Sequence, residues 1–390
     1  MQSQVYYNPT KVIFGSSSYE QLCEEIKKSG IKKLLIVFGK ESAKITGVYD
    51  RIKKCLAMNG IADEELWGVQ PNPLISKVRE GIAICKDKTK CIEGVLAVGG
   101  GSVIDTSKAI CFGSKMENDI WEIFCGMSLP PPEGLPLFVA STISMTGSGL
   151  NNSAVISNPE SHSKLPSIFD YPKICAIDPT VEMSLPWRQV MCGAVDALSH
   201  LMENYFSMDN KNITTRQINL ALQKSVIKSI ERVKANKEDV EARANFCWAA
   251  SLALSGLTVF GLSGDWNVHH IEHALSAFDE KIAHGEGLAV ISLAYYPQLY
   301  AKDVCNEMFE EWALEVFGKK DVKEAFAMLR ELYVYWGAPL TLQDLKVKPE
   351  DIEEIVKIEQ EQQMLGAASD LWYLDEEDVK NILLASVAQK

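Results

Sequence analysis

The sequence is poor in histidine, has no Cys-x-x-Cys pair and carries no excess of positive charge. It contains 39 Lys plus Arg against 52 Asp plus Glu, which gives a formal net charge of −13. Because neutralising the phosphates of nucleic acid requires clustered cations, this balance argues against a nucleic-acid-binding protein. The hydrophobic fraction of 47%, with 23% charged residues, is ordinary for a globular protein and too apolar for a disordered one.

Secretion and membrane insertion are also poorly supported. Most of the ten cysteines stand in apolar runs, as core residues do, so we expect reduced thiols and a cytoplasmic protein. The first seven residues lack the basic and apolar regions of a signal peptide. The span 244–264 is uncharged and long enough to cross a bilayer, but its hydroxyl groups and glycines keep its hydrophobicity low. It predicts a buried helix that ends near Gly256 or Gly261, and no membrane segment.

The first half of the chain alternates strand and helix patterns. Short apolar runs predict strands at 33–38, 65–69, 94–98 and 137–141. Helical periodicity follows three of them, over 43–59, 76–85 and 103–112. This alternation predicts a parallel sheet covered by helices on both faces.

Helical patterns dominate after Pro186. They cover 187–206, 213–234, 240–256, 307–317, 321–336 and 350–362. With 390 residues, against about 150 for a typical domain, we expect two domains: an α/β, Rossmann-like domain of nucleotide-binding type over 1–185, and an all-α domain over 186–390. The cleft between them is the expected place for chemistry.

Two loops rich in small residues follow predicted strands. Gly99-Gly100-Gly101-Ser102 stands between a strand and a helix, where free backbone N–H groups and the positive helix end can hold a phosphate. It matches neither the G-x-G-x-x-G nor the P-loop motif, and glycine turns also join strands to helices for structural reasons. The second loop, Thr142–Ser148, offers hydroxyl groups after another strand. A dinucleotide lies across such loops at the carboxyl ends of parallel strands.

Five of the six histidines fall in two short segments. Asp196 and His200 are four residues apart, on one face of a predicted helix, where they either ligate one metal ion or form a surface pair. The other segment supplies His269, His270, His273 and His284. Three imidazoles and one carboxylate suit Zn²⁺ or Fe²⁺ and leave room for a substrate oxygen. Spacing alone does not decide which of the imidazoles at 269–273 bind the metal.

Taken together, these segments resemble the iron-containing (group III) alcohol dehydrogenase family, in its branch of butanol dehydrogenases and broad-range aldehyde reductases. The resemblance covers essentially the whole chain, and its joint pattern is more specific than any one motif. It rests on Asn8–Gly15, Gly99–Lys108, Thr142–Ser148, Gly193–Glu203, Gly264–Gly285 and Leu374–Leu383. It implies the two-domain fold shared by dehydroquinate synthase and the iron-containing alcohol dehydrogenases.

The resemblance also implies roles for single residues. The metal ligands fall on Asp196, His200, His269 and His284. His273 takes the place beside the nicotinamide and is the candidate for proton relay. The cofactor-binding positions fall on Gly39, Ser42, Gly99, Gly100, Gly101, Ser102, Asp105, Thr142, Thr146, Ser148 and Lys164. His162 and His270 match no functional position and are expected at the surface.

The chain departs from the family pattern at three places. The interval from His269 to His284 is one residue longer than usual, which predicts an insertion in the loop 279–282. Ser144 and Gly149 stand where relatives commonly have Pro and Glu. The shape of the pocket near the nicotinamide is therefore expected to differ.

The implied reaction interconverts a primary alcohol and an aldehyde, with hydride carried by NAD(P) and a divalent metal acting as Lewis acid. The turn Gly39-Lys40-Glu41-Ser42 favours NADP over NAD. Gly39 stands where NAD-preferring relatives often carry Asp, and Lys40 and Ser42 can receive a 2′-phosphate, although Glu41 opposes it. The expected substrate is a butanal-like aldehyde or a small polar one, sulfonated or hydroxylated. A homodimer is implied, paired near Val5–Tyr7.

Two alternatives follow from the same residues. The first is a metal- and NAD-dependent lyase of the dehydroquinate synthase type, which requires a pocket rich in Lys and Arg. The segments 187–205 and 264–288 offer only Arg188 and Lys281, which disfavours it. The second, a non-catalytic metal- or nucleotide-binding protein, is disfavoured because the cofactor and metal motifs are both complete.

Overall fold

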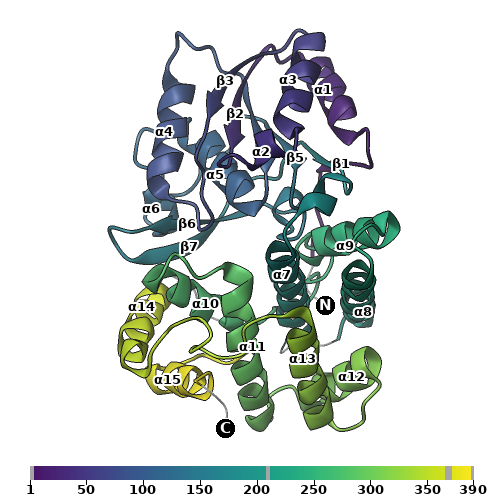
Figure 1. The fold of residues 1–390 in the computed structure, drawn as a ribbon. Helices are drawn as coiled ribbons and strands as arrows, with labels where there is room; N and C mark the ends of the chain where they lie inside the picture. Colours follow the sequence, from purple (N-terminus) through teal and green to yellow (C-terminus); the bar gives the residue numbers. More distant parts are fainter. Residues whose placement is uncertain (1–3, 208–210, 365–370, 388–390) are drawn as a thin grey trace.

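An α/β domain and a helical domain make up the molecule in the computed structural model (Figure 1). The structure describes residues 4–207, 211–364 and 371–387. In the α/β domain, six strands form one parallel sheet in the order β1-β8-β5-β4-β2-β3. The strands are β1 (Lys11–Phe14), β2 (Lys33–Phe38), β3 (Ala62–Leu66), β4 (Gly94–Gly99), β5 (Leu137–Ser141) and β8 (Ile174–Ile177). The predicted parallel sheet is confirmed.

The central strands of the sheet are apolar on both faces, since they are continuously hydrophobic and their alternate residues point to opposite sides. In β2, Leu35 and Val37 face one core, while Leu34 and Ile36 face the other. The helices that cover the two faces are α1 (Ser18–Lys28) and α3 (Val48–Met58) on one side, and α4 (Ile75–Lys86), α5 (Gly101–Gly113) and α6 (Trp121–Phe124) on the other. Figure 1 shows α1 and α3 together on one side of the sheet and α4 on the other.

Two predicted elements differ from the structure. The helix expected over 43–59 is divided into α2 (Ser42–Ile45) and α3, because Gly47 between them adopts a left-handed conformation with φ of 74°. The strand expected over 65–69 begins at Ala62 and ends at Leu66. The sequence ADEEL lacks the apolar run by which the other strands were predicted. The reason is that β3 is an edge strand whose acidic side chains pair with lysines instead of entering the core.

A small antiparallel hairpin, β6 (Ser153–Asn158) and β7 (Ser163–Ile168), lies where the two domains meet. Two buried side chains of α5 attach it to the α/β domain. Oδ2 of Asp105 accepts a hydrogen bond from the backbone N–H of Val155 at 3.0 Å, and Lys108 donates to the carbonyl oxygen of Ser153 at 2.7 Å. On its other side, β7 contacts helices of the second domain.

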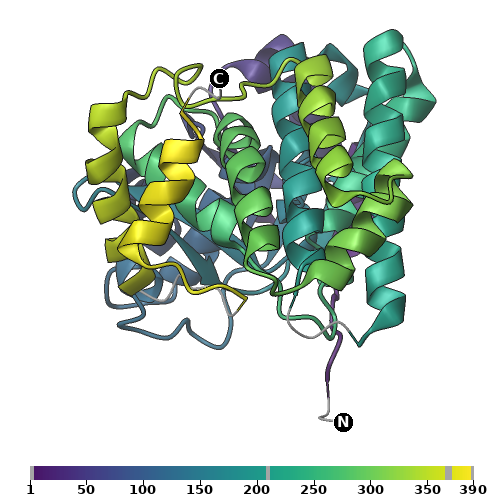
Figure 2. The ribbon, with the colours of Figure 1, turned by 90° about the horizontal axis from the view of Figure 1, so that it is seen from below.

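The second domain is a bundle of helices around one hydrophobic core. The short 3₁₀ turn η3 (Pro349–Asp351) precedes α14, whereas the turns η1 (Ser148–Leu150) and η2 (Val181–Ser184) belong to the α/β domain. Helix α11 contacts α7, α10, α13 and α15, and Figure 2 shows it among its neighbours. The helices are α7 (Trp187–Tyr205), α8 (Ile213–Ala235), α9 (Val240–Ala253), α10 (Asn267–Phe278), α11 (His284–Ala301), α12 (Asn306–Phe317), α13 (Val322–Trp336), α14 (Ile352–Met364) and α15 (Glu376–Ala385).

The uncharged span 244–264 contains the carboxyl-terminal half of α9, which ends at Ala253, slightly before the expected glycines. Across the ranges that the structure describes, no helix is both long and apolar enough to cross a membrane.

One pair of cysteines differs from the expectation of reduced thiols. The structure joins Cys23 of α1 and Cys55 of α3 as a disulfide, with Cα atoms 6.1 Å apart. The two residues are 32 positions apart in sequence, and only the packing of α1 against α3 on one face of the sheet brings them together. The prediction is therefore wrong for this pair.

Glu359 on α14 gives a pH-dependent stability that can be measured. Its side chain is buried, and burial raises its pKa to about 7, although Gln363 and Gln360 donate hydrogen bonds to the carboxylate. Because the folded pKa lies above the unfolded value, the carboxyl stabilises the fold at low pH, and this contribution is lost as the pH rises through 7. We expect Glu359→Gln to raise the free energy of unfolding by about 2 kcal/mol more at pH 8 than at pH 5.

Urea denaturation at the two pH values measures this difference. Glu361→Gln on the same helix is the matched control, because Glu361 is exposed and is expected to give equal stability changes at both values. An equal change in the Glu359→Gln protein at pH 5 and pH 8 would contradict the prediction.

Candidate active site

Three helices bring one aspartate and three histidines together in the helical domain. Asp196 and His200 lie on α7, His269 lies on α10, and His284 begins α11. Oδ1 of Asp196 is 3.6 Å from Nε2 of His200, 3.7 Å from Nε2 of His269 and 3.7 Å from Nε2 of His284. All four side chains predicted as metal ligands therefore converge on one point.

The geometry of this cluster fits a bound cation better than a network of hydrogen bonds. Separations of 3.6–3.7 Å are too long for hydrogen bonds. Two ligands of one tetrahedral ion, each about 2.1 Å from it, lie about 3.4 Å apart. Within the described residues, Oδ1 of Asp196 and Nε2 of His269 are buried without any hydrogen-bond partner. Buried polar atoms rarely remain unpaired, so a divalent metal ion suits this donor set.

The charges around the cluster also suit a cation. Burial alone would raise the pKa of Asp196, but the neighbouring histidines hold it below its usual value, so the carboxylate is anionic. Burial lowers the pKa of His200 to about 4. Burial acts in the same direction on His269, but Glu203 and Asp196 outweigh it and raise its pKa to about 10. A cation at this point is therefore stabilised by the buried carboxylates of Asp196 and Glu203.

Each of two histidines in the cluster has a buried glutamate on its other side. Nδ1 of His269 contacts Oε2 of Glu203, and Nδ1 of His284 contacts Oε2 of Glu272. Both glutamates are fully buried. Burial alone would raise the pKa of Glu272, but His284 and Lys164 lower it to about 2. The two carboxylates are thus anionic hydrogen-bond acceptors for the two rings.

His273, the predicted proton relay, lies beside the cluster. Its ring centroid is 6.1 Å from that of His269 and 5.6 Å from that of His284. Burial, followed by the positive charge of Lys164, lowers the pKa of His273 well below its usual value. The imidazole is therefore neutral at physiological pH.

Lys164 of β7 reaches this region from the α/β domain. Its ammonium lies 3.1 Å from Oε2 of Glu272 and 3.4 Å from Nδ1 of His284. Glu272, His273 and His284 would themselves form a group of metal-ligand type, but the ammonium supplies the positive charge there. Its contact with the cofactor, implied by the resemblance, stays a prediction.

The predicted cofactor residues lie at the carboxyl ends of three neighbouring strands. Gly39 and Ser42 follow β2, Gly99 ends β4 and is followed by Gly100–Ser102, and Thr142–Ser148 follow β5. The loop 99–102 (the glycine loop) and the loop 142–149 (the threonine loop) are in close contact, since a Cβ on Gly101 would lie 2.6 Å from Oγ1 of Thr146. Oγ1 of Thr146 in turn donates to Oγ of Ser148 at 3.1 Å. Backbone N–H groups and hydroxyls thus gather along one edge of the sheet.

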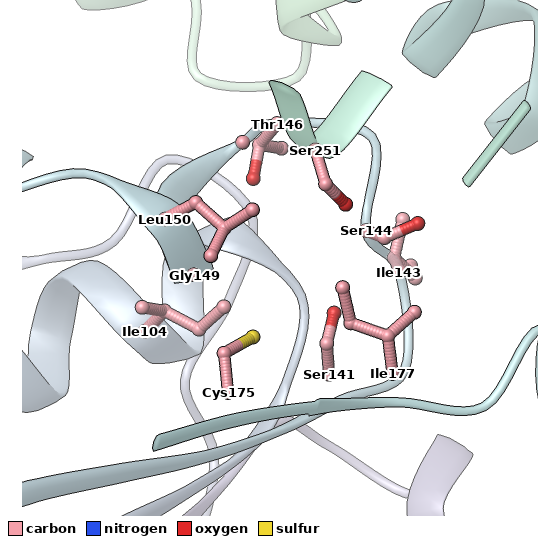
Figure 3. A pocket seen from close by; sticks show the side chains of 11 residues that line it. Ile104, Ser141, Ile143, Ser144, Thr146, Gly149, Leu150, Cys175, Ile177 and Ser251 are labelled. Carbon is pink, nitrogen blue, oxygen red and sulfur yellow. The ribbon is translucent and has the colours of Figure 1, made fainter. Parts of the chain in front are cut away.

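The threonine loop overlies a small cavity against the sheet (Figure 3). Ser144, where relatives commonly have Pro, donates its backbone N–H to Oε1 of the buried Glu182 at 2.8 Å, a bond that proline cannot make. A Cβ on Gly149 would approach Sγ of Cys175 to 2.5 Å. The two departures from the family pattern therefore belong to a loop that is packed closely against the sheet and against Glu182.

The structure also places the other singled-out positions. The loop 279–282 contacts the α/β domain, where Asn72 donates to the carbonyl oxygen of Glu280 at 3.2 Å. The expected insertion there leaves His284 within the cluster. His162 is exposed as predicted, whereas His270 is partly buried on α10 with its Nδ1 enclosed. The expectation that His270 lies at the surface is wrong, because α10 packs against α14.

Three residues near the cluster had no role assigned from the sequence. Glu203 lies two helical turns after Asp196, so helical periodicity places it on the same face of α7 and could have indicated its proximity to the cluster. No comparable sequence pattern indicates Glu272. The third is Trp266, whose left-handed backbone, with φ of 72°, precedes α10. Its ring centroid lies 5.4 Å from that of His269. Such a conformation is strained for a bulky residue and is found at functional sites.

A parallel α/β domain of nucleotide-binding type, joined to a helical domain with an aspartate–histidine cluster, defines a two-domain metal-dependent dehydrogenase. Comparison with known protein families supports this class of enzyme. The family model for iron-containing alcohol dehydrogenase matches residues 9–179, and the model for the C-terminal part of the Fe-containing alcohol dehydrogenase family matches residues 190–387. The chain belongs to the iron-containing alcohol dehydrogenase family.

Individual relatives match nearly the full length of the chain. It is 37% identical to NADH-dependent butanol dehydrogenase A of Clostridium acetobutylicum, over 92% of each chain. The crystal structure of NADH-dependent butanol dehydrogenase A from Thermotoga maritima has a TM-score of 0.95 and 37% identity, covering 100% of this chain and 99% of that one. The protein is an oxidoreductase that interconverts an alcohol and an aldehyde, as the resemblance implied, and the lyase alternative is not retained.

Proposed function

We propose that this enzyme is an NAD(P)H-linked aldehyde reductase whose metal is held by Asp196, His200, His269 and His284. The observation that carries the proposal is the approach of three Nε2 atoms to one carboxylate oxygen at 3.6–3.7 Å. In this proposal residues 1–185 bind the cofactor and residues 186–390 bind the metal. Both Fe²⁺ and Zn²⁺ suit the donor set, and the family name favours iron.

The protein's own groups prepare the reaction. When bound, the metal supplies Lewis-acid polarisation of the carbonyl oxygen, and the nicotinamide supplies hydride. The burial of Asp196 and His269 excludes water, so charges act strongly there. Neutral His273 passes the proton between substrate and solvent through its two ring nitrogens.

The cofactor is proposed to lie along the carboxyl edge of the sheet. Backbone N–H groups of Gly99–Ser102, at the start of α5, hold the pyrophosphate. Asp105, one turn further along α5, accepts a hydrogen bond from Val155 and holds β6 beside this helix, and its support of the loop is part of the proposal. The nicotinamide half is lined by Thr142, Thr146, Ser148 and Lys164, and the adenosine half by Gly39 and Ser42.

The turn after β2 supports NADP as the cofactor. Glu41, which would repel a 2′-phosphate, lies 3.5 Å from the ammonium of Lys44, so its charge is partly compensated. Lys40 beside it is exposed. The butanol dehydrogenase relatives named above are called NADH-dependent. These names favour NADH, whereas the turn after β2 in this chain favours a 2′-phosphate, and on the basis of that turn we propose that NADPH is used at least as well as NADH.

An apolar, butanal-like aldehyde is the proposed substrate. Both relatives are named as butanol dehydrogenases. A sulfonated aldehyde would need a cation for its anionic group, and Lys164, a cation beside the cluster, is already paired with Glu272. We also propose a homodimer, because the exposed segment Val5–Tyr7 leads into the edge strand β1.

A panel of aldehydes with NADPH and NADH tests these assignments on the metal-replete enzyme. We expect the highest kcat/KM with short alkyl aldehydes, and a kcat/KM for NADPH no lower than that for NADH. Lys40→Ala should lower kcat/KM for NADPH by roughly tenfold and leave that for NADH unchanged, because it removes one phosphate contact.

Lys32→Ala is the matched control for this experiment, since Lys32 is exposed just before the amino end of β2, away from the turn. A large preference for NADH in the unmodified enzyme would overturn the NADP assignment. Activity confined to sulfonated or hydroxylated aldehydes would overturn the substrate assignment.

A further inference from the structure

Two of the four proposed ligands share an arrangement that the other two lack. His269 and His284 each direct Nε2 towards Oδ1 of Asp196 and place Nδ1 against a fully buried glutamate. The third imidazole, His200, has an Nδ1 that is buried without a partner in the described part of the chain. A glutamate partner at Nδ1 is thus found for His269 and His284 but not for His200.

We propose that Glu203 and Glu272 are positioning residues that fix the ring orientation and protonation pattern of His269 and His284. Each carboxylate accepts the Nδ1–H and thereby leaves the Nε2 lone pair for the metal. Such carboxylate–histidine pairs hold the ring in place and increase the basicity of the ligand. This inference rests on the metal site proposed above, and it adds two residues to which the sequence assigned no role.

Glu203 is itself held in place by its surroundings. Oε1 accepts the backbone N–H of His269 at 3.1 Å, and Oε2 accepts the hydroxyl of Ser199 at 3.0 Å. The carboxylate therefore contacts both the backbone and the ring of His269. Because α7 carries Glu203 as well as Asp196, it determines the position of the His269 ring from two sides.

Glu272 is held by a different set of groups. The hydroxyl of Ser276 donates to Oε1, and the ammonium of Lys164 lies 3.1 Å from Oε2. Since Lys164 belongs to β7 of the α/β domain, the orientation of His284 depends on contact between the domains. The glutamate that holds His269 belongs instead to α7, within the helical domain.

Metal affinity provides a test that does not require activity. The metal-free full-length protein is titrated with Zn²⁺ in competition with a chromophoric chelator. We expect Glu203→Gln and Glu272→Gln each to weaken Zn²⁺ binding by about 10–100-fold. Glu286→Gln is the matched control, because Glu286 lies on α11 two residues after His284 but pairs with Arg188 at 2.6 Å. We expect it to bind Zn²⁺ as the unmodified protein does.

The visible spectrum of the Co²⁺-substituted protein provides a readout that a purely structural role would not change. The d–d bands report the geometry of the ligands around the ion. We expect the two glutamine variants to have altered bands and the Glu286→Gln protein to keep the unmodified spectrum. If a glutamine variant does not fold, Ser199→Ala and Ser276→Ala replace it, and each should weaken Zn²⁺ binding by roughly 3–10-fold through its glutamate.

The possible failures are distinguishable. If the unmodified protein binds no Zn²⁺, or if Asp196→Asn binds it unchanged, the proposed metal site is wrong. If Asp196→Asn loses Zn²⁺ while the variants at Glu203 and Glu272 match Glu286→Gln in affinity and spectrum, the metal site stands and the positioning role is overturned.

Discussion

Removal of the metal is expected to abolish NAD(P)H-dependent aldehyde reduction, and returning Fe²⁺ or Zn²⁺ should restore it. The loss should reach at least about 10³-fold in kcat, because electrostatic stabilisation of the developing charge is commonly the largest contribution to such a reaction. His269→Ala should have a similar effect. It deletes one of the three Nε2 atoms and leaves Glu203 buried without the ring that it contacts.

The measurement is the rate of NAD(P)H oxidation before chelation, after it and after metal is added back, with elemental analysis of each sample. His162→Ala is the control for the histidine substitution, because His162 is exposed and lies on the β6–β7 connection. Unchanged reduction by the metal-free protein, or full activity in the His269→Ala protein, would refute the metal-dependent mechanism.

Gly285→Ala is expected to damage both the fold and the metal site. A Cβ at this position would lie 2.6 Å from Cα of Cys192 and closer still to its carbonyl oxygen. These are backbone atoms of α7, so no side chain can rotate away, and α7 and α11 must separate. We expect the free energy of unfolding to fall by about 3 kcal/mol.

Metal affinity should fall with it, because α11 begins with His284 and α7 carries Asp196 and His200. Urea denaturation and Zn²⁺ titration measure the two effects. Gly318→Ala is the control: its φ is +67° and nothing lies within 4 Å of the added Cβ, so it should cost about 1 kcal/mol of stability without changing metal affinity. A Gly285→Ala protein that binds Zn²⁺ normally, with stability equal to this control, would contradict the prediction.

Local sequence patterns predicted the strands closely where a strand is buried on both faces and is therefore apolar throughout. The apolar runs 33–38 and 137–141 match β2 and β5 residue for residue, because strands buried on both faces are continuously hydrophobic. The same rule misplaced β3, where Asp63 and Glu64 are paired with lysines at the edge of the sheet. Helix α7 was placed within one residue by its periodicity.

By itself, the sequence determined the order of elements, the parallel sheet, the glycine turn between β4 and α5 and the shared face of Asp196 and His200. These features depend on contacts between residues close in sequence, where period and turn chemistry decide the outcome. Family resemblance then supplied the choice among the histidines of α10, which spacing had left open.

Only the tertiary structure decided how distant segments meet. Packing of α7, α10 and α11 brings Asp196 to within 3.7 Å of His269 and His284. It also sets Glu203 and Glu272 behind those rings and Cys23 against Cys55. Contacts of this kind depend on how close-packed helices are placed relative to one another, which local periodicity does not encode.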